Sequence, residues 1–407
     1  MKSFIKFWNE VSLVTKIFIG LIIGTGLGFW FPNFTVISVL GDIFVGALKS
    51  IAPILVFTLV LSSLAQNSKK IGKMFFTVIF LYMLNTFLSA TVAIIASFVF
   101  PVSLDFEAVS SISNAPSGIS EVLQDLLVNI VANPVDAISK ANYMGILFWA
   151  VIFGFFLKSI ASENTKQTLK DISDANLKVV CWIINFAPFG ILGLVFRSIS
   201  SKGLNIFLDY GKLILILVGC MLVMAFLIIP FIVALCLKKN PYPLVICCMK
   251  ESGLTAFFTR SSAANIPVNM ILCEKLKLDK DMYSVSIPLG ATINTSGAAI
   301  TISVMTLAAV HTLGISVDFP TALILSLIAS LAACGASGVA GGSLLLIPMA
   351  CSLFGIDNDI SMQVVGAGFI IGIVQDSFET ALNSSSDVIF TATAEYMQKN
   401  KFVANDK

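Results

Sequence analysis

Several polar side chains near the C-terminal end of the chain share one face of a predicted helix. Four of them follow one another at i, i+4, i+7 and i+11: Asp376, Thr380, Asn383 and Asp387. Glu379 lies at the edge of this stripe. The surrounding segment is apolar, and each carboxylate facing lipid would cost about 2.5 to 3.5 kcal/mol. We therefore expect the stripe to face a partner, an ion or water; a purely structural network of ion pairs is the alternative.

A second polar interruption occurs in the preceding apolar run, at residues 294–297 (Asn-Thr-Ser-Gly), with Gly290 one turn earlier. Glycine and short polar side chains let a helix unwind and turn its carbonyl oxygens toward a cation such as Na⁺. Together with Asn383 and Asp387, this segment predicts a site for a monovalent cation. Three residues of the third run could add oxygen ligands or join helices: Tyr82, Asn85 and Thr86.

Ser261 and Ser262 are predicted to begin a helix, where free backbone N–H groups attract a carboxylate. A solute that carries an ammonium group for Asp376 and a carboxylate for this serine pair is an amino acid. Arg260 is the one basic residue well placed at this depth, and we expect it to bridge Asp376 and Glu379. Glu379 would then be an ion-pair partner or accept a hydrogen bond from a substrate hydroxyl; a position in a wet vestibule is the alternative.

The composition identifies the kind of protein that holds these residues. Of 407 residues, 57% are hydrophobic and 12% charged, about half the charged fraction of a soluble domain. The net charge of +2, with no basic run, gives no indication of a nucleic-acid partner. Eight cysteines without a C-x-x-C pair and a single histidine do not form a metal motif. The glycines of residues 24–28 lie inside an apolar run, which favours helix packing over dinucleotide binding.

Apolar runs long enough to cross a bilayer predict an all-α membrane protein with eight transmembrane helices. The runs lie near 13–31, 36–63, 71–100, 142–161, 176–200 and 208–237, with one more beginning near 284 and a last one ending near 394. Residues 101–140 are expected to form an extracellular loop with short helical segments. Lysines gather on alternate loops, which predicts that both termini are cytoplasmic.

Two further stretches have arms too short to cross a membrane, near 241–278 and 319–354. Their centres, residues 259–265 and 335–343, are rich in small and polar residues. The lysine pattern gives the two hairpins opposite orientations, so they predict an inverted repeat of re-entrant hairpins with a solute site between them. Two ordinary helical pairs at the surface are the alternative, which would leave many apolar residues in water.

The chain resembles the dicarboxylate/amino acid:cation symporters, the family of the glutamate transporter homologues, and within it the bacterial serine/threonine:sodium symporters. The likeness spans nearly the whole chain and is carried by residues 259–268, 286–294, the second glycine-rich tip and residues 376–387. It implies a homotrimer and an elevator mechanism. It also implies a scaffold and trimerisation domain of residues 1–69 and 101–203, a transport domain of residues 70–100 and 204–396, and a cytoplasmic tail of residues 397–407.

The resemblance also implies roles for individual residues. Asp376 matches the position that holds the substrate ammonium group. Other positions that match substrate contacts are Ser262, Val339, Thr380 and Asn383. One sodium site would be formed by Gly290, Asn294, Asn383 and Asp387. A second would be formed, mostly through backbone carbonyls, by Thr292, Ala333, Cys334 and Ala336. A third would include Tyr82, Asn85 and Thr86, but Ser296 stands where the glutamate carriers have an aspartate, so this third site is in doubt.

A second departure concerns the substrate. Glutamate and aspartate carriers have an arginine at the position of Glu379. In this chain, the carboxylate of Glu379 would repel a carboxylate on the substrate side chain. We therefore expect sodium-coupled import of L-serine and L-threonine across the bacterial cytoplasmic membrane. A carrier of the same fold for another neutral amino acid or a dicarboxylate is the alternative. An ion channel fits the occluding hairpins less well, and an intramembrane hydrolase would lack a nucleophile–base pair.

Overall fold

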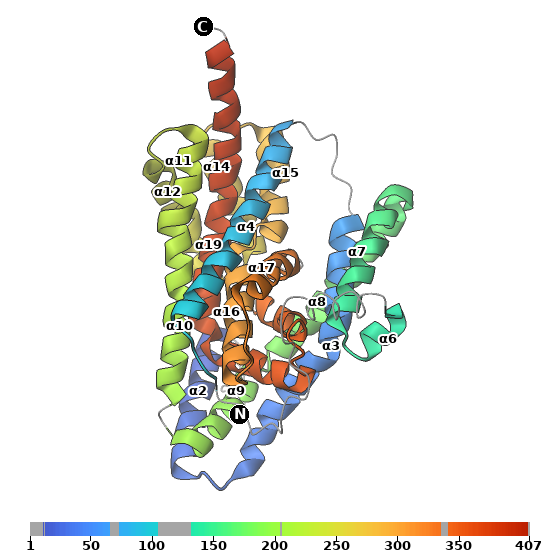
Figure 1. The fold of residues 1–407 in the computed structure, drawn as a ribbon, viewed down its shortest axis with the longest axis vertical. Helices are drawn as coiled ribbons and strands as arrows, with labels where there is room; N and C mark the ends of the chain where they lie inside the picture. Colours follow the sequence, from blue (N-terminus) through green and yellow to red (C-terminus); the bar gives the residue numbers. More distant parts are fainter. Residues whose placement is uncertain are drawn as a thin grey trace.

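The computed structural model describes residues 11, 13–65, 73–104, 132–203, 206–334 and 341–405, and within these ranges the regular structure is helical (Figure 1). Two separate apolar helices have 18 residues each: α2 (Leu13–Trp30) and α7 (Tyr143–Ile160). The longer ones are α3 (Ser38–Ala65), α4 (Lys73–Val99), the run α10–η3–α11 (Ile206–Val223, Met224–Ile228 and Ile229–Leu237), the pair α15 (Lys280–Ile293) and α16 (Ser296–Thr312), and α19 (Asn358–Asn405).

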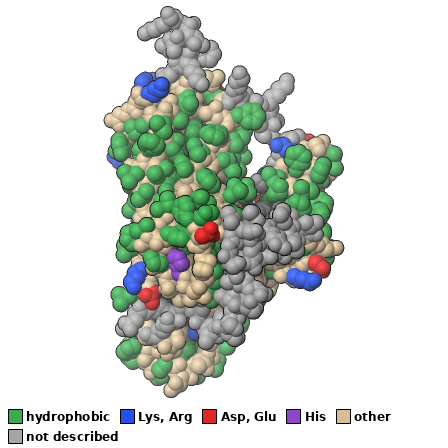
Figure 2. Space-filling model, in the orientation of Figure 1, with side chains coloured by type: hydrophobic (Ala, Val, Ile, Leu, Met, Phe, Trp, Pro, Cys, Tyr) green, Lys and Arg blue, Asp and Glu red, His purple; other side chains and the backbone are tan. Residues whose placement is uncertain are grey.

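Length and composition allow five of these helices to cross a membrane, or six if one bent pair counts as a span. Adding the shorter apolar helices α2 and α7 gives the predicted eight among the described residues. Hydrophobic side chains cover much of the face shown in Figure 2, which suits a protein surrounded by lipid. The prediction of an all-α membrane protein is confirmed.

The bent pair corrects one predicted span. The apolar run predicted near residues 176–200 is not one continuous helix, because α8 (Glu163–Ile184) and α9 (Ala187–Lys202) meet at an angle of 53°. The first half of α8 is polar and cannot lie in hydrocarbon. Pro188, in the first turn of α9, lacks the N–H that would continue the preceding helix.

Helices α2 and α9 pack so closely that their backbones touch. A Cβ atom added to Gly20, Gly24 or Gly28 would lie 2.2, 2.6 or 2.8 Å from a backbone oxygen of α9. The three glycines are four residues apart and therefore share one helical face. This confirms helix packing as the role of the glycines near residues 24–28. Helices α3, α7 and α8 complete this part of the molecule.

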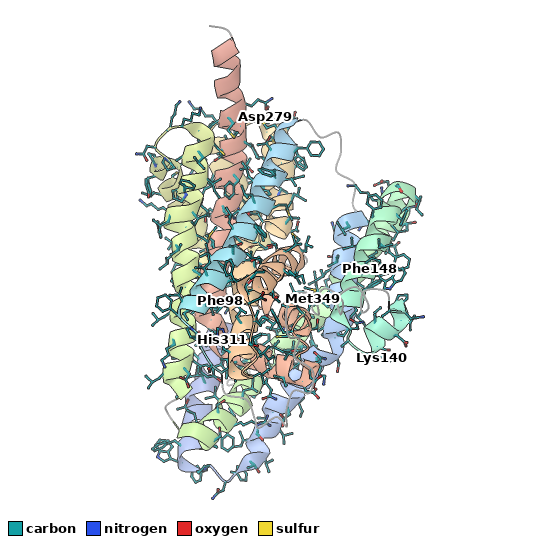
Figure 3. All side chains as sticks on the ribbon, viewed as in Figure 1. Phe98, Lys140, Phe148, Asp279, His311 and Met349 are labelled. Atoms are coloured by element: carbon teal, nitrogen blue, oxygen red, sulfur yellow. The ribbon has the colours of Figure 1, made fainter. Side chains whose placement is uncertain are left out.

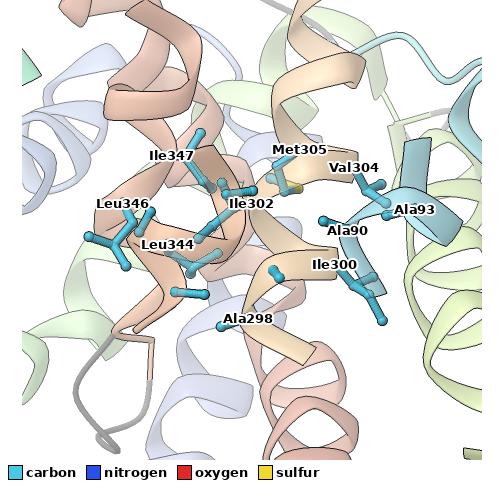
Figure 4. Close-up of a cluster of buried hydrophobic side chains, with 14 of the residues drawn as sticks. Ala90, Ala93, Ala298, Ile300, Ile302, Val304, Met305, Leu344, Leu346 and Ile347 are labelled. Carbon is cyan, nitrogen blue, oxygen red and sulfur yellow. The ribbon is translucent and has the colours of Figure 1, made fainter. Parts of the chain in front are cut away.

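Helix α16 forms the centre of the other part and is buried along its whole length before His311. Its apolar side chains contact α4 on one side and the segment η5–α18 (Ser343–Leu346 and Ile347–Ser352) on the other (Figure 4). Phe98 and His311 meet edge to face at one end, with ring centroids 6.4 Å apart. Asp279 lies at the opposite end (Figure 3).

Both predicted hairpins have the expected short arms. In the first, the run α12–η4–α13 (Tyr242–Cys248, Met249–Gly253 and Leu254–Thr259) packs against α14 (Ser262–Lys275). In the second, α17 (Phe319–Ala333) packs against η5 and α18. The remaining short helices are η1 (Thr35–Ile37) and α6 (Pro134–Ser139). The loop expected over 101–140 lies mostly outside the described residues.

Candidate functional site

The centre of the candidate site is an ion pair between the first hairpin and α19. The Nε atom of Arg260 donates to Oδ2 of Asp376 at 2.8 Å, and the two side chains are 12% and 4% exposed. A carboxylate buried this deeply needs a partner, and the guanidinium supplies one. The expected pairing of Arg260 with Asp376 is therefore confirmed.

The turn at the hairpin tip brings Arg260 to this position. Arg260 ends α13 with a φ of +52°, in the left-handed region that residues other than glycine rarely adopt. Ser261 follows in an extended conformation, and its hydroxyl accepts a hydrogen bond from the N–H of Ala264 at the start of α14. Ser262, in the first turn of α14, is buried beside this tip.

A buried amide cluster attaches the first hairpin to α19. Asn265 donates to the hydroxyl of Ser384 at 2.7 Å, and Asn269 donates to the backbone carbonyl of Ser384 at 3.0 Å. Ser252, on the other arm, donates to Asn269 and accepts from Asn265. The cluster attaches both arms of the hairpin to α19 at Ser384, about one helical turn from Thr380. The sequence analysis missed it, although Asn265 and Asn269 are spaced i, i+4.

The surroundings of Glu379 correct the predicted bridge. Among the described carboxylates, Arg260 pairs with Asp376 and not with Glu379. Oε2 of Glu379 instead accepts hydrogen bonds from Thr301 at 2.8 Å and Ser343 at 2.9 Å. Gln375, one turn earlier on α19, also donates to Oε2. The prediction that Arg260 bridges both carboxyl groups is wrong, because neutral donors from α16, the second hairpin and α19 itself surround Glu379.

Gly297 explains how α16 approaches Glu379 so closely. A Cβ atom at this position would lie 2.8 Å from Cα and 2.9 Å from Cγ of Glu379. The backbone N–H of Gly297 also donates to Oδ1 of Asn383 at 2.7 Å. Ser296 donates weakly to the same oxygen, at 3.4 Å. The break between α15 and α16 thus contacts the polar stripe of α19 directly, as the sequence predicts.

Asn294 and Asp387 form the core of the candidate cation site. Asn294 ends α15, and its Nδ2 atom donates to Oδ1 of Asp387 at 2.9 Å and to Ser386 at 2.7 Å. A Cβ atom on Gly290 would lie 2.6 Å from Oδ1 of Asp387. Only glycine leaves room for the carboxyl group of Asp387 at this position. Gly290, Asn294 and Asp387, three of the four residues predicted for this site, therefore lie together. Asn383, the fourth, contributes a backbone oxygen 3.4 Å from Nδ2 of Asn294.

The residues predicted on the third run lie beside this site. Asn85 donates to Oδ1 of Asn294 at 3.0 Å, and the hydroxyl of Tyr82 donates to the backbone carbonyl of Asp387 at 3.0 Å. Both side chains are fully buried. The hydroxyl of Thr86 instead donates to the backbone carbonyl of Tyr82, within α4.

Three buried oxygen atoms near these residues have no hydrogen-bond partner in the described part of the chain: Oδ2 of Asp387, Oδ1 of Asn85 and Oγ1 of Thr295. Buried oxygens without a donor are costly unless something positive lies near them. Carboxylate, amide, hydroxyl and carbonyl oxygens are ligands that hard cations prefer. Within the described residues, no group of three or more His, Cys, Asp and Glu side chains forms a transition-metal site. The donor set therefore fits an alkali cation such as Na⁺.

The residues predicted for the second cation site are partly brought together. The thiol of Cys334 lies 3.6 Å from the backbone oxygen of Ile293, which joins the end of α17 to the end of α15. Ala333 is buried, and the Thr292 hydroxyl turns back to Leu289 of its own helix. Ala336 and Val339 lie outside the described residues. Thr380 is buried on α19 between the Asp376 and Asp387 groups.

Comparison with known proteins identifies the family. The model of the sodium:dicarboxylate symporter family matches residues 13–397. This chain belongs to that family. The symporter is therefore a membrane transporter and not an enzyme, and the family resemblance seen in its motifs is confirmed.

Curated relatives of the symporter cover almost its full length. A serine/threonine transporter of Bifidobacterium adolescentis is 59% identical over 96% of this chain and 90% of its own length. Serine/threonine transporters of Streptococcus agalactiae and Streptococcus thermophilus are 59% and 57% identical, each over 97% of this chain and 98% of their own length.

Proposed function

We propose that this protein is a sodium-coupled symporter that imports L-serine and L-threonine across a bacterial cytoplasmic membrane. The observation that carries the proposal is the pairing of two polar centres on one face of α19. Asp376, with Arg260, provides a charged substrate position, and Asp387, with Asn294, provides an oxygen-rich cation position eleven residues away. The names of relatives at 57–59% identity support serine and threonine as the solutes.

The substrate role of Asp376 follows from its charge and its partner. When an amino acid enters, its ammonium group competes with Arg260 for the carboxylate, and Arg260 is released toward the substrate carboxylate. The N-terminus of α14 at Ser261 and Ser262 adds donors for the same carboxylate. This exchange keeps both buried charges paired in the empty and loaded states.

Glu379 would select the side chain of the substrate. Its Oε2 atom is occupied by three neutral donors, so the carboxyl group is fixed beside Asp376 and one turn from Asn383. A fixed carboxyl group accepts a hydrogen bond from a serine or threonine hydroxyl and repels a second carboxylate. The alternative of a dicarboxylate substrate is disfavoured for the same reason.

The domain boundaries suggest how the site moves. We infer a scaffold built on α2, α3, α7, α8 and α9, and a transport domain built on the remaining long helices and both hairpins. A cavity of about 20 Å³ is lined by Arg260 and Gly341 from the hairpin tips and by Leu13, Ile17 and Ala187 from the scaffold. Sliding of the tips along this contact would expose the site to either side, as in alternating access by an elevator motion. The proposal includes a homotrimer and cytoplasmic termini.

The deciding experiment is uptake of radiolabelled L-serine by purified protein in proteoliposomes, with sodium or potassium outside. The proposal expects accumulation only with an inward sodium gradient, inhibited by unlabelled L-threonine and unaffected by L-aspartate. Accumulation driven equally by potassium would exclude sodium coupling. Competition by L-aspartate at the concentration effective for L-threonine would favour a dicarboxylate carrier, and a serine-independent sodium current would favour a channel.

A further inference from the structure

A cavity of about 500 Å³ lies on the side of α19 opposite the substrate and cation residues. On α19, the cavity is lined by Phe378, Ala381 and Leu382. These positions lie on the helical face opposite the stripe that begins at Asp376. The walls of the cavity come from α10–η3 and from the first arm of the first hairpin. The volume is within the range of about 300–1,000 Å³ typical of ligand pockets.

The mouth of this cavity opens to the outer surface of the protein. Leu222, Ile246 and Leu254 line it and are 41%, 53% and 56% exposed. Helices α10, α11 and α12 form an outer edge of the molecule in Figure 1. In a membrane, this edge contacts acyl chains, so the cavity is filled from the bilayer rather than from water.

Both walls of the cavity contain a π-helical segment. Ala225 and Phe226 come from η3, and Met249, Lys250 and Gly253 come from η4. The widened turns displace side chains from the regular helical positions, and such segments are frequent at functional sites. Tyr242 joins the two walls above the cavity, since its hydroxyl donates to the backbone carbonyl of Phe226 at 3.3 Å.

Lys250 is the one charged residue among the described residues that line the cavity, and because the lining surface is almost wholly apolar, its methylene groups rather than its amine face the cavity. It is exposed, and no described carboxylate pairs with it, because the adjacent Glu251 is bound by Lys275 at 2.6 Å. Lys250 lies eight residues after Tyr242, about 12 Å along the helix from the end that carries Lys238, Lys239 and Lys275. A lysine at this depth extends its amine toward the interface, where lipid phosphates lie.

We propose that this cavity binds one anionic phospholipid, with an acyl chain between α10 and the first hairpin and the phosphate on Lys250. The apolar lining fits the chain, and the unpaired ammonium group fits the headgroup. A second copy of this chain is a poorer occupant, since it would bury the Lys250 charge without a partner on the described surface. The ring of Phe257 contacts Phe378 edge to face at 5.1 Å beside the cavity, three residues before Arg260, so the bound lipid would support the arm that carries the substrate ion pair.

The experiment is native mass spectrometry of the purified full-length protein, titrated with phosphatidylglycerol or phosphatidylcholine in detergent. The proposal expects the protein to retain phosphatidylglycerol about fivefold more strongly, since one lysine near a charged headgroup contributes about 1 kcal/mol. Lys250→Gln should abolish the preference. Lys239→Gln, which removes an exposed lysine beyond the end of α11, should keep it.

A second pair of variants tests the cavity itself. Leu222→Trp fills the mouth and should reduce retention of both lipids, whereas Leu215→Trp, two turns earlier on α10 and 72% exposed, should not. Equal retention of the two lipids by the unmodified protein would overturn the proposal. So would a preference that survives Lys250→Gln, or lipid retention that Leu222→Trp leaves intact. Loss of a dimer mass in the Leu222→Trp variant, with lipid retention unchanged, would assign the surface to a second copy instead.

Discussion

Asn294 donates to Oδ1 of Asp387 at 2.9 Å, while Oδ2 of the same carboxyl group has no hydrogen-bond partner. One oxygen therefore fixes the orientation of the carboxyl group, and the other remains available to a cation. Asn85 shows the same arrangement next to Asn294. Its amide nitrogen donates to Asn294, and its oxygen has no partner among the described residues. We expect the coupling ion to bind near these two oxygens.

Asp387→Asn should weaken activation of uptake by sodium and, through reciprocal linkage, weaken serine binding by a similar factor. The substitution keeps the shape of the side chain and removes the charge that attracts the ion. The measurement is serine affinity as a function of sodium concentration in proteoliposomes. An unchanged sodium dependence in this variant would mean that the ion binds elsewhere.

Gly290→Ala should disrupt the same site without removing any of its oxygen atoms. The added methyl group would lie 2.6 Å from Oδ1 of Asp387 and 2.9 Å from the hydroxyl of Tyr82, so one of them must move. Crowding of this kind costs about 1–3 kcal/mol of folding free energy, and we expect a lower thermal midpoint together with weaker sodium activation. Gly219→Ala on α10 is the matched control, since no described atom lies within 4 Å of a Cβ atom added there. Equal behaviour of the two variants would count against the close contact.

Asp376→Asn should reduce serine uptake more than tenfold. A hydrogen bond to a charged group contributes about 1.5–3 kcal/mol, and the neutral amide has no charge to pair with the substrate ammonium group or with Arg260. Uptake must be normalised to the amount of protein in the membrane. Serine transport at the unmodified rate would exclude Asp376 as the ammonium-binding residue.

Ser343→Ala tests the attachment of the second hairpin to α19. It removes one of three donors to Glu379, which should weaken serine binding by about twofold to tenfold if closure of this hairpin accompanies binding, since a neutral hydrogen bond contributes about 0.5–1.5 kcal/mol. Ser352→Ala is the control, because that hydroxyl bonds only within its own helix. The expected contrast is lost if both variants bind serine equally.

Glu379→Gln should reduce the preference for serine over alanine while leaving sodium activation intact. The neutral amide accepts a weaker hydrogen bond from the serine hydroxyl than a carboxylate does, which lowers the preference for serine. It also no longer repels a second carboxylate, so we expect weak competition by aspartate. Competition assays with alanine and aspartate measure both effects. A variant that keeps full discrimination would leave Glu379 a structural residue.

The sequence predicted those parts of the site that a scarce residue type or a helical period determines. Arg260 was the one basic residue well placed beside the acidic stripe, so its pairing with Asp376 could be anticipated. The stripe from Asp376 to Asp387 could be predicted from helical spacing alone. The break at Asn294 could be predicted because polar residues and a glycine interrupt the apolar run there. The partners of Glu379 could not be predicted in this way, because serine and threonine donors such as Ser343 and Thr301 are common and their contacts depend on tertiary packing. The bend between α8 and α9 was missed for a related reason: an apolar run continues across Asn185 while the helix does not.

The glycine contacts between α2 and α9 bear on how the protein can deform. Because Gly20, Gly24 and Gly28 bring the two backbones together over about two helical turns, we expect α2 and α9 to move as one rigid unit that resists both bending and sliding. Compliance must therefore be concentrated where larger side chains meet, along the surface that Leu13 and Ile17 present to the hairpin tips. If the hairpin tips move along this surface as proposed, a substitution that loosens the α2–α9 contact would spread that motion into the scaffold helices.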